Sequence, residues 1–217
     1  MSLRKALFPF LMLLASAFAA QAQSPGYALV SPPQPTESNG KIEVLEFFWY
    51  GCPHCYHLEP DVNAWLAKKP DDVVFKRVPA IPSQSWGEAG RIYYTLQAMG
   101  LVDQMHDKVF DAIHKDGVNL MNKKIRDQWL AKNGVDPAKY EQVSKSFTVA
   151  TDLSRARQMT LNYKVDSVPR IVVNGKYYTS GDLAGSPERM FPVVDELVAR
   201  IRAENGKSAA PAAKKKK

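Results

Sequence analysis

The organisation of this chain is decided by one stretch, residues 42–55, which reads IEVLEFFWYGCPHC. Its first part, residues 42–50, is nearly continuous in apolar and aromatic residues, as expected of a central strand that is covered on both faces. Its second part holds Cys52 and Cys55, which are the only two cysteines among 217 residues. Whatever chemistry the cysteines perform therefore takes place at the end of a buried strand.

The close spacing of the two cysteines argues against a structural role. A disulfide between residues three positions apart closes almost no loop, so it adds little to stability through chain entropy. Its value must lie in chemistry, and vicinal thiols offer redox exchange or metal binding. A C-x-x-C pair between a buried strand and a helix is the layout of a thioredoxin-like dithiol/disulfide site.

Two other uses of a C-x-x-C pair fit less well. Attachment of c-type haem needs histidine directly after the second cysteine, where this chain has Tyr56. A structural zinc site needs two further ligands, and the remaining candidates, His57, His106 and His114, are not suitably spaced. We expect these three histidines to be ordinary, partly exposed helix residues. We expect no metal and no cofactor beyond a redox-active disulfide between the two cysteines.

The amino terminus indicates where this chemistry takes place. Residues 1–5 are positively charged, residues 6–19 are mostly apolar, and Ala20-Gln21-Ala22 forms an A-x-A cleavage site. We therefore expect residues 1–22 to be a signal peptide, cleaved near Ala22, and the mature protein to be soluble in an oxidising compartment. The alternative is an amino-terminal membrane anchor.

The charge of the chain gives little information about partners. Lysine and arginine total 29 against 22 aspartate and glutamate residues. The leader carries part of this excess, and Lys214–Lys217 carry much of the rest. We expect residues 207–217 to form a disordered, lysine-rich tail. The folded part is then close to neutral, and nothing points to a nucleic-acid partner.

The remaining sequence predicts an α/β frame with a helical interruption. A helix with a buried stripe at Leu58, Val62 and Trp65 leads to a strand over residues 73–78, which gives a parallel strand–helix–strand unit. Residues 83–162 carry only helical patterns. Two strands, 171–173 and 176–178, are then joined by Asn174-Gly175, a strong hairpin signal. A final helix becomes regular near Pro192.

This pattern predicts a divided domain. We expect a thioredoxin-like domain built from residues 23–82 and 149–206, interrupted by an all-helical domain over residues 83–148. The fold class is therefore α/β, a thioredoxin-like fold with an inserted all-helical domain.

The position of Cys52 predicts that it is the reactive cysteine. It lies at or just before the first helical turn, and Pro53 suits the first helical position. The free amide groups and positive end of the helix stabilise a thiolate there, and His54 adds a hydrogen bond or a positive charge. Both effects favour the reduced thiolate and make the disulfide a strong oxidant. Cys55, one turn further in, resolves the mixed disulfide.

Two further features stand near the predicted site. Glu46 is an acid in a strand that should be buried, which is costly unless the carboxyl group is paired or protonated. It either faces a polar pocket, transfers protons for Cys55, or lies at a solvated strand end, and Lys76 is a candidate partner. Pro169, before the hairpin strand, could be an ordinary strand-start proline, because cis X-Pro bonds are a small minority.

Four segments together resemble a known family. Residues 44–48 (VLEFF), 52–56 (CPHCY), 168–169 (VP) and 173–177 (VNGKY) are similar to the DsbA family of bacterial periplasmic thiol:disulfide interchange proteins. The resemblance extends over the chain to about Glu204. Gly51 and the lysine-rich tail need not match other members.

The resemblance implies a fold, an activity and partners. Pro169 would be a cis-proline facing the disulfide, Val168 would offer backbone groups to an extended client, and Glu46 would be a buried acid associated with Lys76. The protein would be a periplasmic monomer that donates its disulfide to newly exported, reduced polypeptides. A quinone-linked membrane protein, DsbB, would reoxidise it.

Two alternatives remain open. The first is a disulfide isomerase or reductase of the same fold. Isomerases of this fold tend to be dimers with an extra amino-terminal domain, and the stretch from Gln23 to Gly51 is too short for one. The second is a client-binding module in which the cysteines are incidental. A Cys52→Ser/Cys55→Ser double variant with full biological function would support the second alternative.

Overall fold

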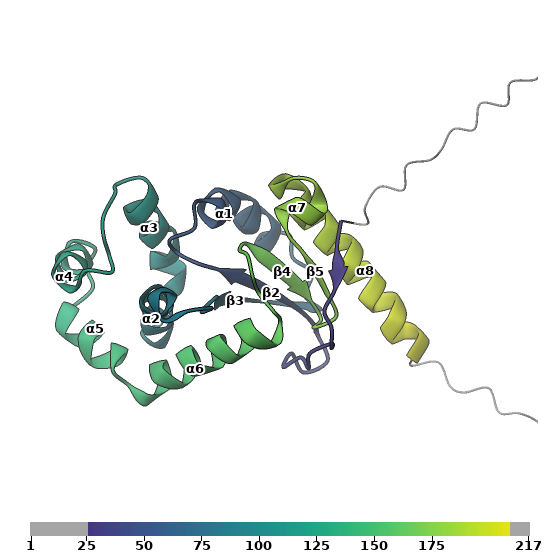
Figure 1. The fold of residues 1–217 in the computed structure, drawn as a ribbon, viewed down its shortest axis with the longest axis horizontal. Coiled ribbons are helices and arrows are strands. Elements are labelled where there is room, and N and C mark those ends of the chain that lie inside the picture. The colour runs from purple at the N-terminus through teal and green to yellow at the C-terminus, as the bar shows by residue number, and fades with distance from the viewer. Residues whose placement is uncertain (1–25, 209–217) are drawn as a thin grey trace, which may run out of the picture.

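The structure is a computed structural model that describes residues 26–208 (Figure 1). The predicted signal peptide at 1–22 and most of the predicted tail lie outside the described residues. The last helix, α8 (Met190–Ser208), extends into the segment predicted as tail. None of the helices within residues 26–208 combines the length and the apolar character that a membrane crossing requires.

A five-stranded sheet in the order β1-β5-β4-β2-β3 forms the centre of the molecule. β2 and β3 are parallel and are connected through helix α1, whereas every other pair is antiparallel. The predicted strand–helix–strand unit and the predicted hairpin are therefore confirmed. The elements are β1 (Ala28–Leu29), β2 (Ile42–Phe48), α1 (Pro53–Leu66), β3 (Val73–Pro79), β4 (Arg170–Val173) and β5 (Tyr177–Thr179).

Strand β2 is buried along its whole length, as the apolar run predicts. Ile42 and Val44 pack in the core cluster that contains α1 and α8. Leu45 and Phe47 belong to the other cluster, where Phe47 lies 5.3 Å from the ring of Tyr163, just after helix α6 (Phe147–Asn162). Because side chains alternate along a strand, residue parity decides which face of the sheet each β2 side chain reaches. Glu46 therefore shares the α1 face.

The helical block between the two halves of the frame contains α2 (Gln84–Ala98), α3 (Val102–His114), α4 (Lys123–Lys132) and α5 (Pro137–Ser144). Helix α2 packs against α3, α5 and α6, and it lies with them to one side of the sheet in Figure 1. Helix α6 contacts α2 and also leads into Tyr163, which packs on β2. The domain boundaries at 82/83 and 148/149 stay a prediction. The short helix α7 (Gly181–Ala184) and a 3-10 turn, Pro187–Arg189, precede α8.

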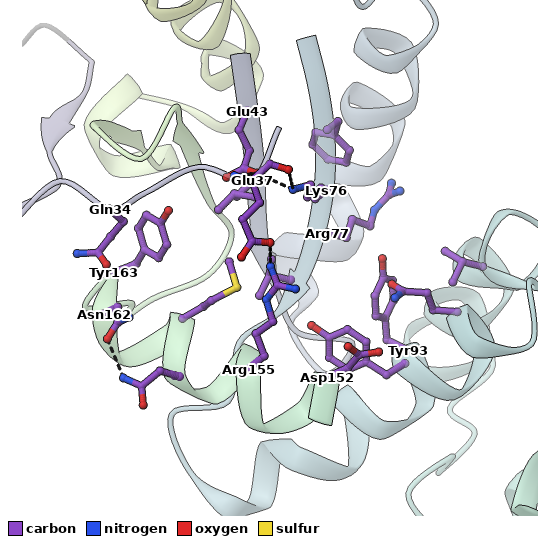
Figure 2. Close-up of a pocket in the computed structure, with 18 of the residues that line it drawn as sticks. Gln34, Glu37, Glu43, Lys76, Arg77, Tyr93, Asp152, Arg155, Asn162 and Tyr163 are labelled. Atoms are coloured by element: carbon purple, nitrogen blue, oxygen red, sulfur yellow. Dashed lines mark hydrogen bonds and ion pairs between the residues drawn. The ribbon is translucent and has the colours of Figure 1, made fainter. Parts of the chain in front are cut away.

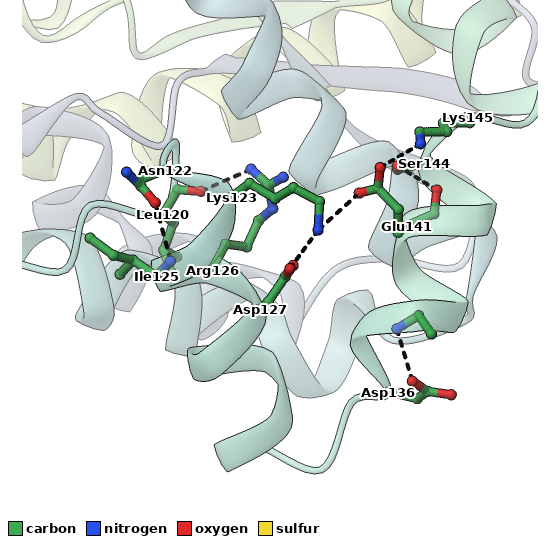
Figure 3. Close-up of polar contacts among 11 residues, drawn as sticks. Leu120, Asn122, Lys123, Ile125, Arg126, Asp127, Asp136, Glu141, Ser144 and Lys145 are labelled. Carbon is green, nitrogen blue, oxygen red and sulfur yellow. Dashed lines mark hydrogen bonds and ion pairs between the residues drawn. The ribbon is translucent and has the colours of Figure 1, made fainter.

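Side-chain caps stabilise the starts of α4 and α5, and an ion pair joins the two helices (Figure 3). The Asn122 side chain accepts from the Ile125 amide at 3.2 Å, and Asp136 accepts from the Ala138 amide at 2.9 Å. Each satisfies one of the amide groups that lack a partner at a helix start. Lys123 lies 3.9 Å from Glu141 and thereby links α4 to α5. Asp136 and Pro137 thus define the start of α5, as N-cap and first helical residue.

The hairpin turn depends on glycine at position 175. Asn174 and Gly175 have φ values of 51° and 65°, both in the left-handed region that a two-residue hairpin turn with matching twist requires. A Cβ atom on Gly175 would also lie only 2.1 Å from the carbonyl oxygen of Gln34. The left-handed conformation disfavours a side chain at position 175, and the close approach of the Gln34 backbone leaves no room for one.

Gly117 allows the two causes to be separated, because it has nearly the same φ, 66°, but a Cβ atom added there would meet nothing within 4 Å. We expect Gly117→Ala to lower the free energy of unfolding by about 1 kcal/mol through conformation alone. Gly175→Ala should lower it more, because the Gln34 segment must also move. Urea unfolding of both variants measures this. Equal losses would contradict the role assigned to the contact.

Candidate active site at the amino end of helix α1

Helix α1 begins at the cysteine pair. Cys52 is the N-cap residue, with φ −92° and ψ 115°, and Pro53 occupies the first turn. The Cys52 carbonyl accepts the first helical hydrogen bond from the Tyr56 amide at 3.1 Å. The Cys52 side chain therefore stands at the positive end of the helix, near amide groups that have no helical partner.

The two thiols differ in accessibility. Both cysteines are free thiols in this structure. Cys52 is 8 % exposed, whereas Cys55 is fully buried at 0 %. His54, between them, is exposed. An incoming thiol can therefore reach the sulfur of Cys52 and not that of Cys55.

The segment before β4 packs on Cys52. The Val168–Pro169 peptide bond is cis. Cys52 Sγ lies 3.5 Å from the Val168 carbonyl oxygen, which accepts a hydrogen bond from Cys52 when the sulfur is protonated. The fold thus brings two distant parts of the sequence together at the reactive sulfur.

The surroundings shift the two thiol pKa values in opposite directions. The pKa of Cys52 falls from its ordinary value of 9.0 to about 6. The largest cause is the hydrogen bond from the Cys55 thiol; the amides of Cys55 and His54 and the charge of His54 add to it, against burial. Burial raises the pKa of Cys55 well above 9.0, and the neighbouring Cys52 adds to the rise. Cys52 is consequently the thiolate at neutral pH.

Glu46, on the α1 face of β2, is fully buried at 0 % exposure. Neither of its carboxyl oxygens has a hydrogen-bond partner among the described residues. Burial, and then the negative charge of Glu59, raise its pKa from 4.5 to about 8, although Arg77 lowers it. Glu46 also interacts electrostatically with Cys55. The carboxyl group is therefore protonated at neutral pH, which reduces the cost of burying it.

The predicted pairing of Glu46 with Lys76 is wrong. Lys76 Nζ lies 2.6 Å from Glu43 Oε2, and Figure 2 shows these two side chains together, with Arg77 on the far side of β3. The register of β2 and β3 explains this, because Lys76 lies opposite Leu45 and Arg77 lies opposite Glu46. Side chains opposite each other in a parallel pair share a face. Lys76 therefore points to the face of the sheet away from α1.

Arg77 is instead the cation next to Glu46. Its Nε lies 3.3 Å from Glu46 Oε2, but the orientation does not make a hydrogen bond. Its Nη2 donates to Glu59 Oε2 at 2.9 Å. Glu59, one turn after Cys55 on the buried face of α1, is 5 % exposed. The two carboxyl groups and the guanidinium thus form one buried cluster.

The expectation that His106 is partly exposed is also wrong. His106, in α3, is 3 % exposed because it packs between Glu59 and the aromatic rings of Phe48 and Phe110. Its Nε2 lies 3.1 Å from Glu59 Oε1, and its Nδ1 lies 2.8 Å from the Tyr50 hydroxyl. His57 is exposed and His114 half-buried, as expected of helix residues.

Sequence reasoning missed Arg77, Glu59, His106 and Tyr50. A signal for two of them exists: Glu59 falls on the stripe of α1 that carries Cys55 and Leu58, and Arg77 has the strand parity opposite to Lys76. No comparable signal identifies His106, because its partners come from elements far away in the sequence.

One group of side chains has the composition of a metal site. Glu59, His106 and Asp107 each offer a ligand atom, and these atoms lie within 4.8 Å of one another. However, Glu59 already pairs with Arg77, and the imidazole nitrogens of His106 are used by Glu59 and Tyr50. The chemistry of this group therefore fits a hydrogen-bond network better than a cation site.

Gly51 is required by the aromatic residue two positions before it. A Cβ atom at Gly51 would lie 2.5 Å from the indole of Trp49. Trp49 in turn stacks on Trp86 of α2, with ring centroids 4.2 Å apart. Glycine before the first cysteine thus lets the Trp49 side chain fold back against the helical block.

The pKa assigned to Cys52 can be tested directly. We expect the ultraviolet absorbance of the thiolate in the reduced protein to titrate with a midpoint of about 6. In Cys55→Ala, whose side chain donates nothing, the midpoint should rise, because the hydrogen bond from Cys55 is the largest cause of the shift. A midpoint near 9.0 in the unaltered protein would contradict the assignment.

Comparison with known proteins agrees with this geometry. A profile of the DSBA-like thioredoxin domain matches residues 72–191. The thiol:disulfide interchange protein DsbA of Azotobacter vinelandii is 43% identical over 77% of this chain and 78% of its own length. That of Pseudomonas aeruginosa is 37% identical over 93% of this chain and 98% of its own.

A solved structure is similar over most of the chain. The crystal structure of Pseudomonas aeruginosa DsbA has a TM-score of 0.79 and 39% sequence identity, and the match covers 83% of this chain and 94% of that one. The cysteine pair at the start of α1, the thioredoxin-like sheet and these similarities agree. The chain belongs to the DsbA family of thiol:disulfide interchange proteins and is a thiol-disulfide oxidoreductase.

Proposed function

We propose that this protein is a periplasmic dithiol oxidase that donates a Cys52–Cys55 disulfide to newly exported, reduced proteins. The observation that carries the proposal is that Cys52, at the N-cap of α1, is the accessible thiol of the pair, while Cys55 is fully buried. These surroundings lower the pKa of Cys52 to about 6 and raise that of Cys55. Stabilising the Cys52 thiolate stabilises the reduced protein relative to its disulfide, so the disulfide is readily given away.

The first step forms a mixed disulfide at the accessible sulfur. A client thiolate attacks Cys52 Sγ, the new sulfur–sulfur bond forms, and the Cys52–Cys55 bond breaks with its electron pair on Cys55. The pKa of Cys55 is high, so its thiolate is a poor leaving group and needs a proton. Glu46, protonated at neutral pH and electrostatically coupled to Cys55, supplies that proton.

The second step releases the client. A second client thiolate attacks the client sulfur of the mixed disulfide, which forms the client's own disulfide and expels Cys52 as a thiolate. The low pKa of Cys52 makes it a good leaving group. Two electrons have then passed from the client to the cysteine pair, which is left as one thiolate and one thiol.

Four neighbouring residues support these steps. Pro53 sets the first helical turn, and the charge of His54 contributes to the low pKa of Cys52. The Val168 carbonyl, 3.5 Å from Cys52 Sγ, and the adjacent cis Pro169 are proposed to receive the backbone of an extended client. A client strand there would lie beside the sulfur that it reduces.

The wider setting follows from the same chemistry. Each turnover leaves the protein reduced, so an oxidant must restore the disulfide, and we assign this to a DsbB-like, quinone-linked membrane protein. The A-x-A site ending at Ala22 supports export to the periplasm. The protein is proposed to act as a monomer, with a helical domain at 83–148 inserted between thioredoxin-like parts at 23–82 and 149–206.

The test is the oxidation of a reduced, unfolded client that carries two cysteines, by stoichiometric oxidised protein. The client should gain its disulfide while the protein becomes a dithiol. Cys52→Ser and Cys55→Ser should both be inactive, and only Cys55→Ser, with Cys52 present, should form mixed disulfides with an oxidised client. Retention of oxidation by Cys52→Ser would refute the proposal.

The role of Glu46 gives a second prediction. The measured quantity is the rate constant for attack of a small thiolate on the oxidised protein, calculated from the thiolate concentration at each pH. For wild-type protein this rate constant should fall as the pH rises through about 8, where Glu46 loses its proton. Glu46→Gln should be slower by roughly tenfold or more at neutral pH and should lack this decline. Glu43→Gln is the matched control, because Glu43 is a buried acid of the same strand on the opposite face. An identical loss in both variants would show a structural effect only.

The low pKa of Cys52 also predicts how stability depends on pH. The group titrates near 9.0 when unfolded and near 6 when folded. A depressed pKa gives a stabilisation that is complete above pH 9.0 and is lost as the pH falls to about 6. The reduced protein should therefore gain stability over Cys52→Ser across this window, measured by denaturant unfolding. A difference that does not change with pH would contradict the assignment.

A further inference from the structure

His106 is a buried titratable residue that the steps above do not use. It comes from α3, in the helical block, and contacts Glu59 of α1, in the thioredoxin-like frame. A histidine that is 3 % exposed and hydrogen-bonded at both ring nitrogens is held in one orientation. This fixed orientation affects the two buried acids, Glu59 and Glu46.

Glu59 and Glu46 compete for one cation, Arg77. Glu59 makes the better contacts: Oε2 accepts from Arg77 Nη2 at 2.9 Å, and Oε1 lies 3.1 Å from His106 Nε2. Among residues 26–208, the cation that pairs with Glu46 is Arg77, whose Nε lies 3.3 Å away without making a hydrogen bond. Two adjacent carboxyl groups in a dry site do not both ionise readily, so the proton stays on the one with fewer donors.

The partners of His106 fix its tautomer. The ionised carboxylate of Glu59 can only accept, so His106 Nε2 carries the hydrogen and donates it. Nδ1 then accepts from the Tyr50 hydroxyl, 2.8 Å away. Tyr50 is itself 1 % exposed, so water does not compete for this contact.

The charges around His106 come from every element packed on it. Glu59 of α1 and Asp107 of its own helix favour the imidazolium, whereas Arg77 of β3 and burial disfavour it. Burial is the largest cause, and it lowers the pKa of His106. The ring is therefore neutral at neutral pH and acts as a hydrogen-bond donor to Glu59 without adding a charge.

We propose that His106 is a positioning residue that decides which of the two buried carboxyl groups holds the proton. By donating to Glu59, it keeps that carboxyl group ionised and directed at Arg77, and it thereby leaves the proton on Glu46, the acid coupled to Cys55. The inference concerns the location of the proton, and its importance for turnover rests on the proposed role of Glu46.

The test measures the two acids themselves. Carbon-13 NMR of protein labelled at the glutamate carboxyl groups gives their titrations, with Glu46→Gln and Glu59→Gln to assign the signals. In His106→Leu, which donates nothing, the pKa of Glu46 should fall by about one unit or more and that of Glu59 should rise. In His106→Gln, whose amide can still donate to Glu59, both should stay near their wild-type values.

Tyr50→Phe is a milder variant in case His106→Leu does not fold. It removes the hydroxyl that donates to Nδ1 and holds the ring in its orientation toward Glu59, but it leaves the imidazole, so the pKa of Glu46 should fall by less than in His106→Leu. Unchanged Glu46 titration in the folded His106→Leu or in Tyr50→Phe would overturn the inference. An equal fall in His106→Gln and His106→Leu would also overturn it, because donation would then not be the cause.

The same variants separate this inference from the proposed role of Glu46. If the pKa of Glu46 shifts in these variants, the pH at which the rate constant for thiolate attack begins to fall should shift by the same amount. A shift of the carboxyl titration without a shift of the rate profile would refute the role of Glu46 as proton donor and would leave the assignment of His106 intact.

Discussion

A sulfur anion at Cys52 is stable because the helix begins at that residue. The Cys55 thiol, one turn on, donates the hydrogen bond that lowers the pKa of Cys52 most, and the backbone amides of Cys55 and His54 at the start of the helix add to it. A disulfide can use none of these interactions. The same contacts that lower the pKa of Cys52 therefore weaken the Cys52–Cys55 bond, and the oxidising chemistry follows from where one helix starts.

Burial produces the second half of the mechanism. Cys55 and Glu46 are both at 0 % exposure, so each disfavours its charged form. Cys55 is a poor leaving group as a thiolate because its pKa is high, and Glu46, which interacts electrostatically with it, keeps its proton until about pH 8. Arg77 limits the cost of the buried acids, but it is engaged mainly by Glu59. The helical block takes part through His106 and thus does more than cover the site.

The elements of the fold that depend on local patterns could be predicted from the sequence. The apolar run of β2, the stripe of α1 and the Asn174-Gly175 turn each encode their own geometry. The cysteine pair likewise identifies the reactive centre by its spacing alone. Glu46 is recognisable because an acid in a buried strand is rare, but its partner is not, since choosing between Lys76 and Arg77 requires the register of β2 on β3. The environment of His106 depends on the docking of α3 against α1, which no local pattern contains.

The central claim is that the site stabilises the reduced pair over its disulfide. The most direct measurement is to equilibrate the mature protein in graded glutathione redox buffers and to follow the state of Cys52 and Cys55 by thiol alkylation. The account predicts that the pair stays reduced until the buffer is strongly oxidising. If the pair is already oxidised in a reducing buffer, at redox potentials near that of thioredoxin, the account is contradicted and the protein would act as a reductase.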